Sequence, residues 1–192
     1  MKTATDQKAT SLETVQSSLL NMGLLDGLSS AQFHDFLQQA VHKTYPKGFV
    51  LFAQGDEAEA FYLITRGWVK LYRETLDGEE AVVDVLTTGH LFGETAIFEE
   101  DGYGMSAETV EEAEIVSLPL GLLKQLMAES PQLSMNMLKT MSRFRRQQDM
   151  ELEHRTLQNA SQRIGCFLLR LCKPDAKSPI RLNLPYDKTL IA

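Results

Sequence analysis

Regularly spaced glycines constrain the fold of this chain more than any other feature of its sequence. They stand at positions 48, 55, 67, 78 and 89, roughly ten residues apart, and bound short runs rich in Val, Ile, Leu and Tyr. Asp77-Gly78 is a hairpin-turn signal, and Gly55 and Gly67 are expected to supply the positive φ of tight turns. The spacing predicts antiparallel strands that close into a barrel or sandwich. The predicted strands cover residues 48–52, 60–65, 67–74, 81–86, 106–110 and 113–119.

Helical periodicity flanks the strand region on both sides. Residues 12–25 and 29–40 carry helical spacing, and Ser29 or Ser30 is placed to cap the second helix. Past Pro119 the period of the apolar residues changes from two to about 3.6. This change predicts a short helix over residues 120–129 and a long one from Pro131 to about residue 158. The fold class is therefore α+β.

The long helix carries an apolar stripe that needs a partner. Its members follow one another at steps of three or four residues: Leu133, Met137, Met141, Phe144, Gln148 and Leu152. The chain's own strands could cover part of this stripe. Because the stripe continues where such contacts should end, we expect a parallel helix of a second subunit to cover it. The sequence therefore predicts a homodimer.

Charge is distributed unevenly along the chain, whose formal net charge is −7. Residues 74–114 hold thirteen acids and no base, whereas residues 139–173 hold eight bases and three acids. Either both regions are solvated faces, or the C-terminal end is organised to approach polyanions. For Arg143, Arg145 and Arg146 we favour solubilising an exposed helix face over contact with DNA.

No segment indicates a membrane or an oxidising compartment. Residues 1–11 are polar and lack the apolar core of a signal peptide, and no apolar run approaches membrane-spanning length. Cys166 and Cys172 do not make a disulfide framework. We therefore expect a cytoplasmic protein.

Two short segments together look like an anion-binding cassette that lacks its cation. They are Phe92-Gly93-Glu94-Thr95-Ala96 and Met105-Ser106-Ala107. A turn and helix that open at Gly93 would direct backbone N–H groups and a helix dipole at a phosphate. Yet no Lys or Arg occurs between Thr75 and Ile115.

Several motifs, in this order, resemble the CRP/FNR family of transcription regulators. Segments 47–56, 60–64 and 67–72 resemble the glycine-turned β-roll of that family, and segment 89–94 resembles the start of its cyclic-nucleotide-binding cassette. Residues 133–157 stand at the family's dimerisation helix, and residues 159–171 resemble the helix that leads into its DNA-binding domain.

The resemblance implies a definite architecture. Residues 1–18 would form a polar tail and the start of a helix, residues 19–130 an antiparallel, jelly-roll-like β-roll sensor, and residues 131–158 the dimerisation helix. Residues 159–192 would begin a winged helix-turn-helix domain and stop before its recognition helix, so we expect this chain not to read DNA sequence by itself. Effector binding between β-roll and long helix would shift the helix pair and reposition the DNA-binding domains.

The cassette disfavours cyclic AMP as the effector. The resemblance implies that Glu94 accepts a hydrogen bond from the ribose 2′-hydroxyl, while an arginine and a following Ser or Thr hold the phosphate. Ser106 and Ala107 match that pattern, but Met105 stands where the arginine would be. A charge-assisted bond to phosphate contributes about 1.5–3 kcal/mol, so its loss weakens binding about tenfold to a hundredfold.

Haem is the alternative effector group. Segments 62–64 and 157–160 look closest to the nitric-oxide-responsive, denitrification-regulating branch, for which haem is the family expectation. The candidate axial ligands are His34, His42, His90 and Met105, with His90 foremost because it directly precedes the cassette. Each histidine has a surface or capping role as its plainer interpretation. An iron–sulfur cluster would need about four cysteines, and the chain has two.

An enzyme of the cupin type is the hypothesis from another class. A cupin metal site needs a His-x-His pair followed by a Glu, and here His90 and Glu94 stand without a second histidine. Ser106 has no histidine or acid placed to activate it as a nucleophile. We therefore expect neither catalysis nor a metal site.

Overall fold

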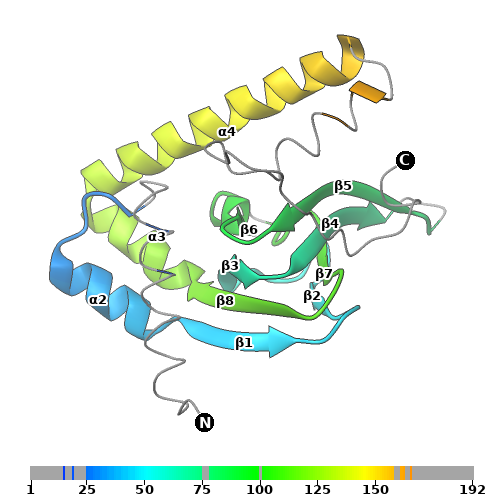
Figure 1. The fold of residues 1–192 in the computed structure, drawn as a ribbon. Helices are drawn as coiled ribbons and strands as arrows, with labels where there is room; N and C mark the ends of the chain where they lie inside the picture. The colour runs from blue at the N-terminus through cyan, green and yellow to red at the C-terminus, as the bar shows by residue number, and fades with distance from the viewer. Residues whose placement is uncertain are drawn as a thin grey trace, which may run out of the picture. The chain divides into compact units, whose positions relative to one another are not determined.

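The computed structural model describes residues 15, 19, 25–74, 78–99, 101–157, 161, 162 and 165. The chain divides into two compact units, Met1–Met137 and Leu138–Ala192. The strands lie in the first unit (Figure 1). They are β1 Val41–Tyr45, β2 Val50–Phe52, β3 Ala60–Arg66, β4 Trp68–Glu74, β5 Glu80–Thr87, β6 Leu91–Phe92, β7 Ser106–Thr109 and β8 Ala113–Pro119. The helices are α2 Ser30–Gln38, the 3-10 helix η1 Glu94–Ile97, α3 Leu120–Glu129 and α4 Pro131–Leu157.

The strands form two four-stranded antiparallel sheets. One has the order β1-β8-β3-β6 and the other β2-β7-β4-β5. Strand β8 pairs with both β1 and β3, while β4 pairs with both β5 and β7. Non-consecutive strands are therefore neighbours in each sheet, as they must be when a ribbon of strands rolls up. The predicted α+β class and antiparallel β-roll are confirmed.

The glycines act as the sequence predicts. Gly55 and Gly67 both have left-handed φ values, of 85° and 93°. A Cβ on Gly67 would also lie 2.9 Å from the backbone of Ala113, so the turn between β3 and β4 admits no side chain. Strands β4 and β5 pair down to Glu74 and Glu80, which confirms the predicted hairpin up to its turn. The turn residues 75–77 lie outside the described part of the chain.

Ser29 is the N-cap of α2, one of the two candidates from the sequence. Its hydroxyl accepts a hydrogen bond from the Gln32 backbone N–H, and the Gln32 Oε1 accepts one from the Ser29 backbone N–H. This capping box fixes the start of the helix. Phe36 of α2 is then buried and packs against Phe61 of β3, with ring centroids 6.2 Å apart. The predicted helix over residues 12–25 lies almost wholly outside the described residues.

The first turns of α4 are part of the core of the roll. Leu133 and Met137 are 0% and 1% exposed and belong to the same hydrophobic cluster as the interior strand residues. The Asn136 side chain donates to the Asp26 carbonyl at 2.6 Å, which ties this helix to the turn before α2. The first two members of the apolar stripe are therefore covered within their own chain, which is one of the two covers that the sequence allowed for part of the stripe.

A different face of α4 is left open. Met135 and Leu138, three residues apart, are 52% and 57% exposed, and Met141 is half-buried. Arg143, Arg145 and Arg146 are exposed, as a solvated helix face requires. The side chains of Phe144, Gln148 and Leu152, and most of residues 158–192, lie outside the described part of the structure. No helix in the described ranges has the length and apolar character needed to span a bilayer.

Candidate functional site

The first cassette segment forms a sharp turn rather than an α-helix. Strand β6 ends at Phe92, Gly93 adopts a left-handed φ of 78°, and the four-residue 3-10 helix η1 follows. Ala96 is buried, Thr95 points outward and is exposed, and Glu94 is half-buried. The expected helix at Gly93 is thus a single tight turn. Its dipole is correspondingly small, because a macrodipole grows from aligned peptide units over several turns.

Aromatic rings surround the backbone of this turn. Phe52 and Tyr103 stack with centroids 3.7 Å apart, and Tyr62 stacks on Phe92 at 5.2 Å. A Cβ on Gly93 would lie 3.3 Å from the Tyr103 ring and 3.5 Å from that of Tyr62. Burial, helped by a hydrogen bond with Tyr103, raises the pKa of Tyr62. Glycine at 93 is therefore needed both for its φ and for the space that the rings occupy.

The loop before the second cassette segment is fastened to the loop between β2 and β3. The Tyr103 backbone accepts from Gly55 N at 2.8 Å and donates to the Asp56 carbonyl at 3.0 Å. The Tyr103 hydroxyl donates to the Ala60 carbonyl at 2.6 Å. A Cβ on Gly102 would lie only 2.0 Å from the Asp56 carbonyl oxygen. These contacts, which we call the loop clasp, hold residues 102–106 against residues 53–60.

Ser106, the predicted phosphate-binding hydroxyl, is already engaged. It is 3% exposed, and its Oγ accepts a hydrogen bond from Gln54 N at 2.9 Å. It also hydrogen-bonds the Tyr72 hydroxyl, which it faces across β7 and β4; burial raises the pKa of Tyr72, and this bond opposes the rise. Its neighbour Ala107 is fully buried. The Ser106 hydroxyl thus already bonds two groups of the fold.

Glu94 is the chemically unusual member of the cassette. Burial raises the pKa of its carboxyl, and a hydrogen bond from its own backbone N–H partly offsets that rise. No Lys or Arg of the described residues forms an ion pair with it. The carboxylate thus takes up an N–H that an incoming anion would otherwise use. Met105, beside Ser106, is half-buried.

The cation next to Ser106 in the sheet is neutralised. Lys70 lies opposite Glu108, and Tyr72 lies opposite Ser106, on adjacent strands β4 and β7. The Lys70 Nζ is 2.5 Å from Glu80 Oε2 and 3.3 Å from Glu108 Oε2, and it lies 4.6 Å from the centre of the Tyr72 ring. Burial works to lower the pKa of Lys70, but its bonds to the two carboxylates raise it overall. Sequence reasoning missed this cluster, because it depends on strand register.

The histidines proposed as haem ligands lie on separate elements. His90 is exposed on the turn between β5 and β6, and its Nδ1 is 2.9 Å from the Thr87 carbonyl oxygen. His34 bonds Gln38 within α2. Of the described residues, no three His, Cys, Asp or Glu side chains form a group that could hold a metal ion.

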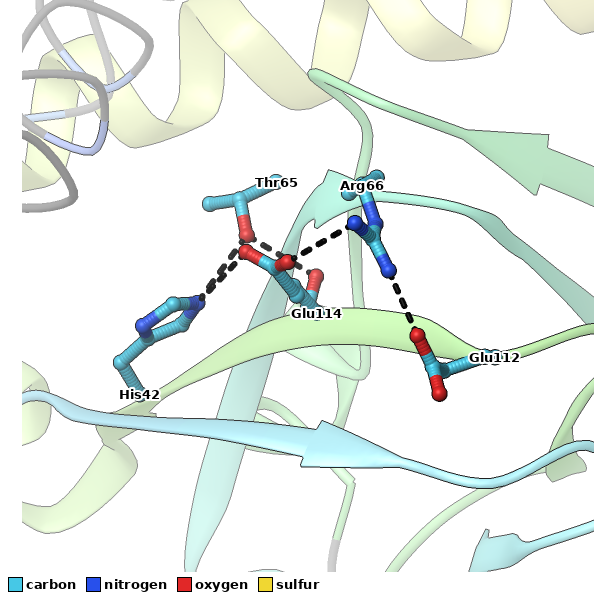
Figure 2. Close-up of polar contacts among 5 residues, drawn as sticks. All are labelled: His42, Thr65, Arg66, Glu112 and Glu114. Atoms are coloured by element: carbon cyan, nitrogen blue, oxygen red, sulfur yellow. Dashed lines mark hydrogen bonds and ion pairs between the residues drawn. The ribbon is translucent and has the colours of Figure 1, made fainter. Parts of the chain in front are cut away.

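His42 belongs to a polar network across β1, β3 and β8 that the sequence did not indicate (Figure 2). Its Nε2 is 3.6 Å from Glu114 Oε2 and 3.4 Å from Thr65 Oγ1. Arg66 bridges Glu112 at 2.6 Å and Glu114 at 3.4 Å. The network joins three strands on an exposed sheet face, which suits a brace better than a haem ligand.

Comparisons with known proteins agree with this geometry. The profile of the family "Cyclic nucleotide-binding domain" matches residues 42–130. The Cyclic AMP receptor protein of Thermus thermophilus is 31% identical over 150 residues, which cover 78% of this chain and 69% of that protein. A crystal structure of a protein from Ruegeria pomeroyi is 36% identical with a TM-score of 0.68 and covers 86% of this chain and 73% of its own. The crystal structure of DNR from Pseudomonas aeruginosa is 29% identical with a TM-score of 0.62, covering 92% and 78%.

Proposed function

Because the chain belongs to the CRP/FNR family of transcription regulators and carries the sensor domain of such a regulator, we propose that it detects a small effector at the cassette and transmits the signal through α4. The continuity of the core supports this proposal. Phe92 and Ala96 of the cassette belong to the same buried cluster as Leu133 and Met137 of α4. A ligand that moves the cassette would therefore disturb the packing of the helix, since close-packed cores transmit displacement.

We propose that the chain acts as a homodimer and is part of a regulator that binds DNA through a C-terminal domain, of which residues 159–192 are the beginning. The exposed pair Met135 and Leu138 supports a helix-to-helix contact along α4, because two large apolar side chains three residues apart share one helix face. Met141, Phe144, Gln148 and Leu152, which continue the stripe begun by Leu133 and Met137, remain predicted dimerisation residues of their own face of the helix. Sedimentation should give a dimer at micromolar concentration without any ligand, and a monomer would contradict this assembly.

The cassette chemistry favours an effector other than a cyclic nucleotide. A phosphate would find Met105 in place of an arginine, a Ser106 hydroxyl bonded to Gln54 and Tyr72, and a Lys70 paired with two carboxylates. Calorimetric titration with cyclic AMP tests this ranking. Tight binding would reverse it.

Haem is the second candidate, and one observation favours His90 as its ligand. Donation of the Nδ1 proton to the Thr87 carbonyl would direct the Nε2 lone pair away from the turn, which is how metal-ligating histidines are commonly oriented. The structural similarity to DNR is consistent with the resemblance to the denitrification-regulating branch of the family.

Haem reconstitution tests the His90 hypothesis directly. Protein reconstituted with haem should show a Soret band, and His90→Ala should lose it or shift it, because the axial ligand sets the electronic spectrum. His34→Ala is the matched control, since His34 bonds Gln38 on a separate helix. An unchanged spectrum in His90→Ala would exclude His90 as the ligand.

We propose no catalytic activity, since the relatives are transcription regulators, and we propose that the regulator acts in the cytoplasm.

A further inference from the structure

The segment that precedes Met105 is covered by a carboxylate of the same chain. A Cβ built on Gly104 would lie 2.8 Å from one carboxylate oxygen of Glu99 and 3.4 Å from the other. Gly104 does not have the left-handed φ that glycines elsewhere in this roll adopt. A side chain at position 104 would therefore have to displace the Glu99 carboxylate, which is the far end of a flexible side chain and lies where that side chain would start.

Gly104 cannot easily move away from Glu99. On one side of it, Tyr103 is held by its backbone bonds to Gly55 and Asp56. On the other side, Ser106 is held by Gln54 N. Glu99 itself is exposed and forms no salt bridge with a Lys or Arg of the described residues. The loop clasp thus fixes the backbone beneath a carboxylate whose charge is not neutralised.

We propose that Glu99 is a specificity-determining residue that makes the cassette reject phosphate-bearing ligands. A phosphate that approached Met105 and Ser106 would meet a negative charge already seated against Gly104. Like charges at such distances repel, and no Lys or Arg of the described residues pairs with Glu99 to compensate that repulsion. The proposal rests on the proposed function, because it takes the cassette as the effector site. It adds that restoring the missing arginine alone does not restore phosphate binding.

The reason is that an arginine introduced at position 105 would pair with the Glu99 carboxylate before a ligand arrived. A guanidinium beside a carboxylate forms a charge-assisted, often bidentate pair. That pair would consume the donors that a phosphate needs. Both the missing cation and the resident anion must then be changed together, and their effects on affinity must be coupled rather than additive.

A double-mutant cycle with cyclic AMP as the probe tests this inference. Calorimetry would compare the wild type, Met105→Arg, Glu99→Gln and the double variant Met105→Arg with Glu99→Gln. We expect weak or undetectable binding of cyclic AMP by the wild type and by Glu99→Gln. The double variant should bind at least tenfold more tightly than Met105→Arg. Pairing Met105→Arg with Glu111→Gln is the control, since it removes one charge from the same acidic segment past the far end of β7 and should leave Met105→Arg unchanged.

Each outcome decides the proposal. Binding by Met105→Arg as tight as that of the double variant would overturn the role of Glu99 and leave the cassette as effector site. Tight binding by the wild type would also overturn it. If the double variant fails to bind although its thermal melt matches the wild type, the role of Glu99 is overturned. The proposed effector site is unaffected by that result, because that proposal does not take cyclic AMP as the effector. An equal gain from Glu111→Gln would show that net charge, and not the contact with Gly104, is responsible.

Discussion

At the scale of single residues, the polar groups in and beside the cassette already have hydrogen-bond or ion-pair partners within the chain. Ser106 is bonded to Gln54 and Tyr72, Glu94 accepts from its own N–H, and Lys70 pairs with two carboxylates. The residue types in the cassette, including Met105, could be read from the sequence. Their hydrogen-bond partners could not, because Gln54 and Ser106 are 52 residues apart and meet only through strand register.

Glu94 gives a pH-dependent prediction at this scale. Burial raises its folded-state pKa, so the folded protein holds the proton more tightly than the unfolded chain does. Stability contributed by this group is then present at low pH and falls as pH rises from the ordinary carboxyl value through the raised one. Glu94→Gln, which stays neutral, should therefore gain in free energy of unfolding relative to wild type as pH rises from about 4 to 8.

Urea unfolding at several pH values measures that difference. Glu57→Gln provides the control, because it makes the same chemical change at an exposed position outside the cassette. A Glu94→Gln difference that stays flat across the range would contradict a folded-state pKa of Glu94 that burial raises.

At the scale of elements, the loop clasp is the feature that the glycine pattern only hinted at. The spacing of Gly55 and Gly67 predicted turns, and the structure confirms their φ values. Gly102 has a second requirement that spacing cannot reveal, because its Cα faces the carbonyl of Asp56 in another loop. A glycine needed for a contact far along the chain looks the same in sequence as one needed for its φ.

Comparing two glycines separates these requirements. Gly48 and Gly102 have similar φ values, of 76° and 81°, but a Cβ on Gly48 would meet nothing within 4 Å. Gly48→Ala should cost about 1–2 kcal/mol, the penalty of an L-residue in left-handed backbone. Gly102→Ala should cost at least about 2 kcal/mol more, because it also breaks the loop clasp. Equal losses in chemical denaturation would show that the contact with Asp56 contributes nothing.

At the scale of the whole molecule, the long helix shows what periodicity can and cannot reveal. Periodicity predicted a helix from Pro131 to about residue 158, and α4 runs from Pro131 to Leu157. It also predicted that Leu133 and Met137 are covered, and both are buried. It could not tell which members the chain itself covers, because a stripe of apolar residues has the same spacing whether its own chain or a second copy buries it.

The dimer prediction therefore moves to the exposed face of α4. Replacing Met135 and Leu138 together by Glu should shift the sedimentation equilibrium toward monomer by at least tenfold in dissociation constant, because it places like charges in an apolar contact. The swap of Met135→Leu with Leu138→Met keeps the apolar area and should remain dimeric. Loss of the dimer in both variants, or in neither, would place the interface elsewhere.

The pairing of β1 with β8 has a consequence for how the chain folds during synthesis. Val41 lies opposite Ser117, and β1 is the edge strand of its sheet, with β8 as its neighbour there. Strand β1, which leaves the ribosome first, therefore cannot form its hydrogen bonds in the sheet until β8, the last strand, has been synthesised. Contacts so distant in sequence slow folding and prolong the exposure of unpaired strand edges. We expect the nascent roll to stay incomplete until β8 has emerged, so that a stall in translation before residue 113 would leave β1 without its partner.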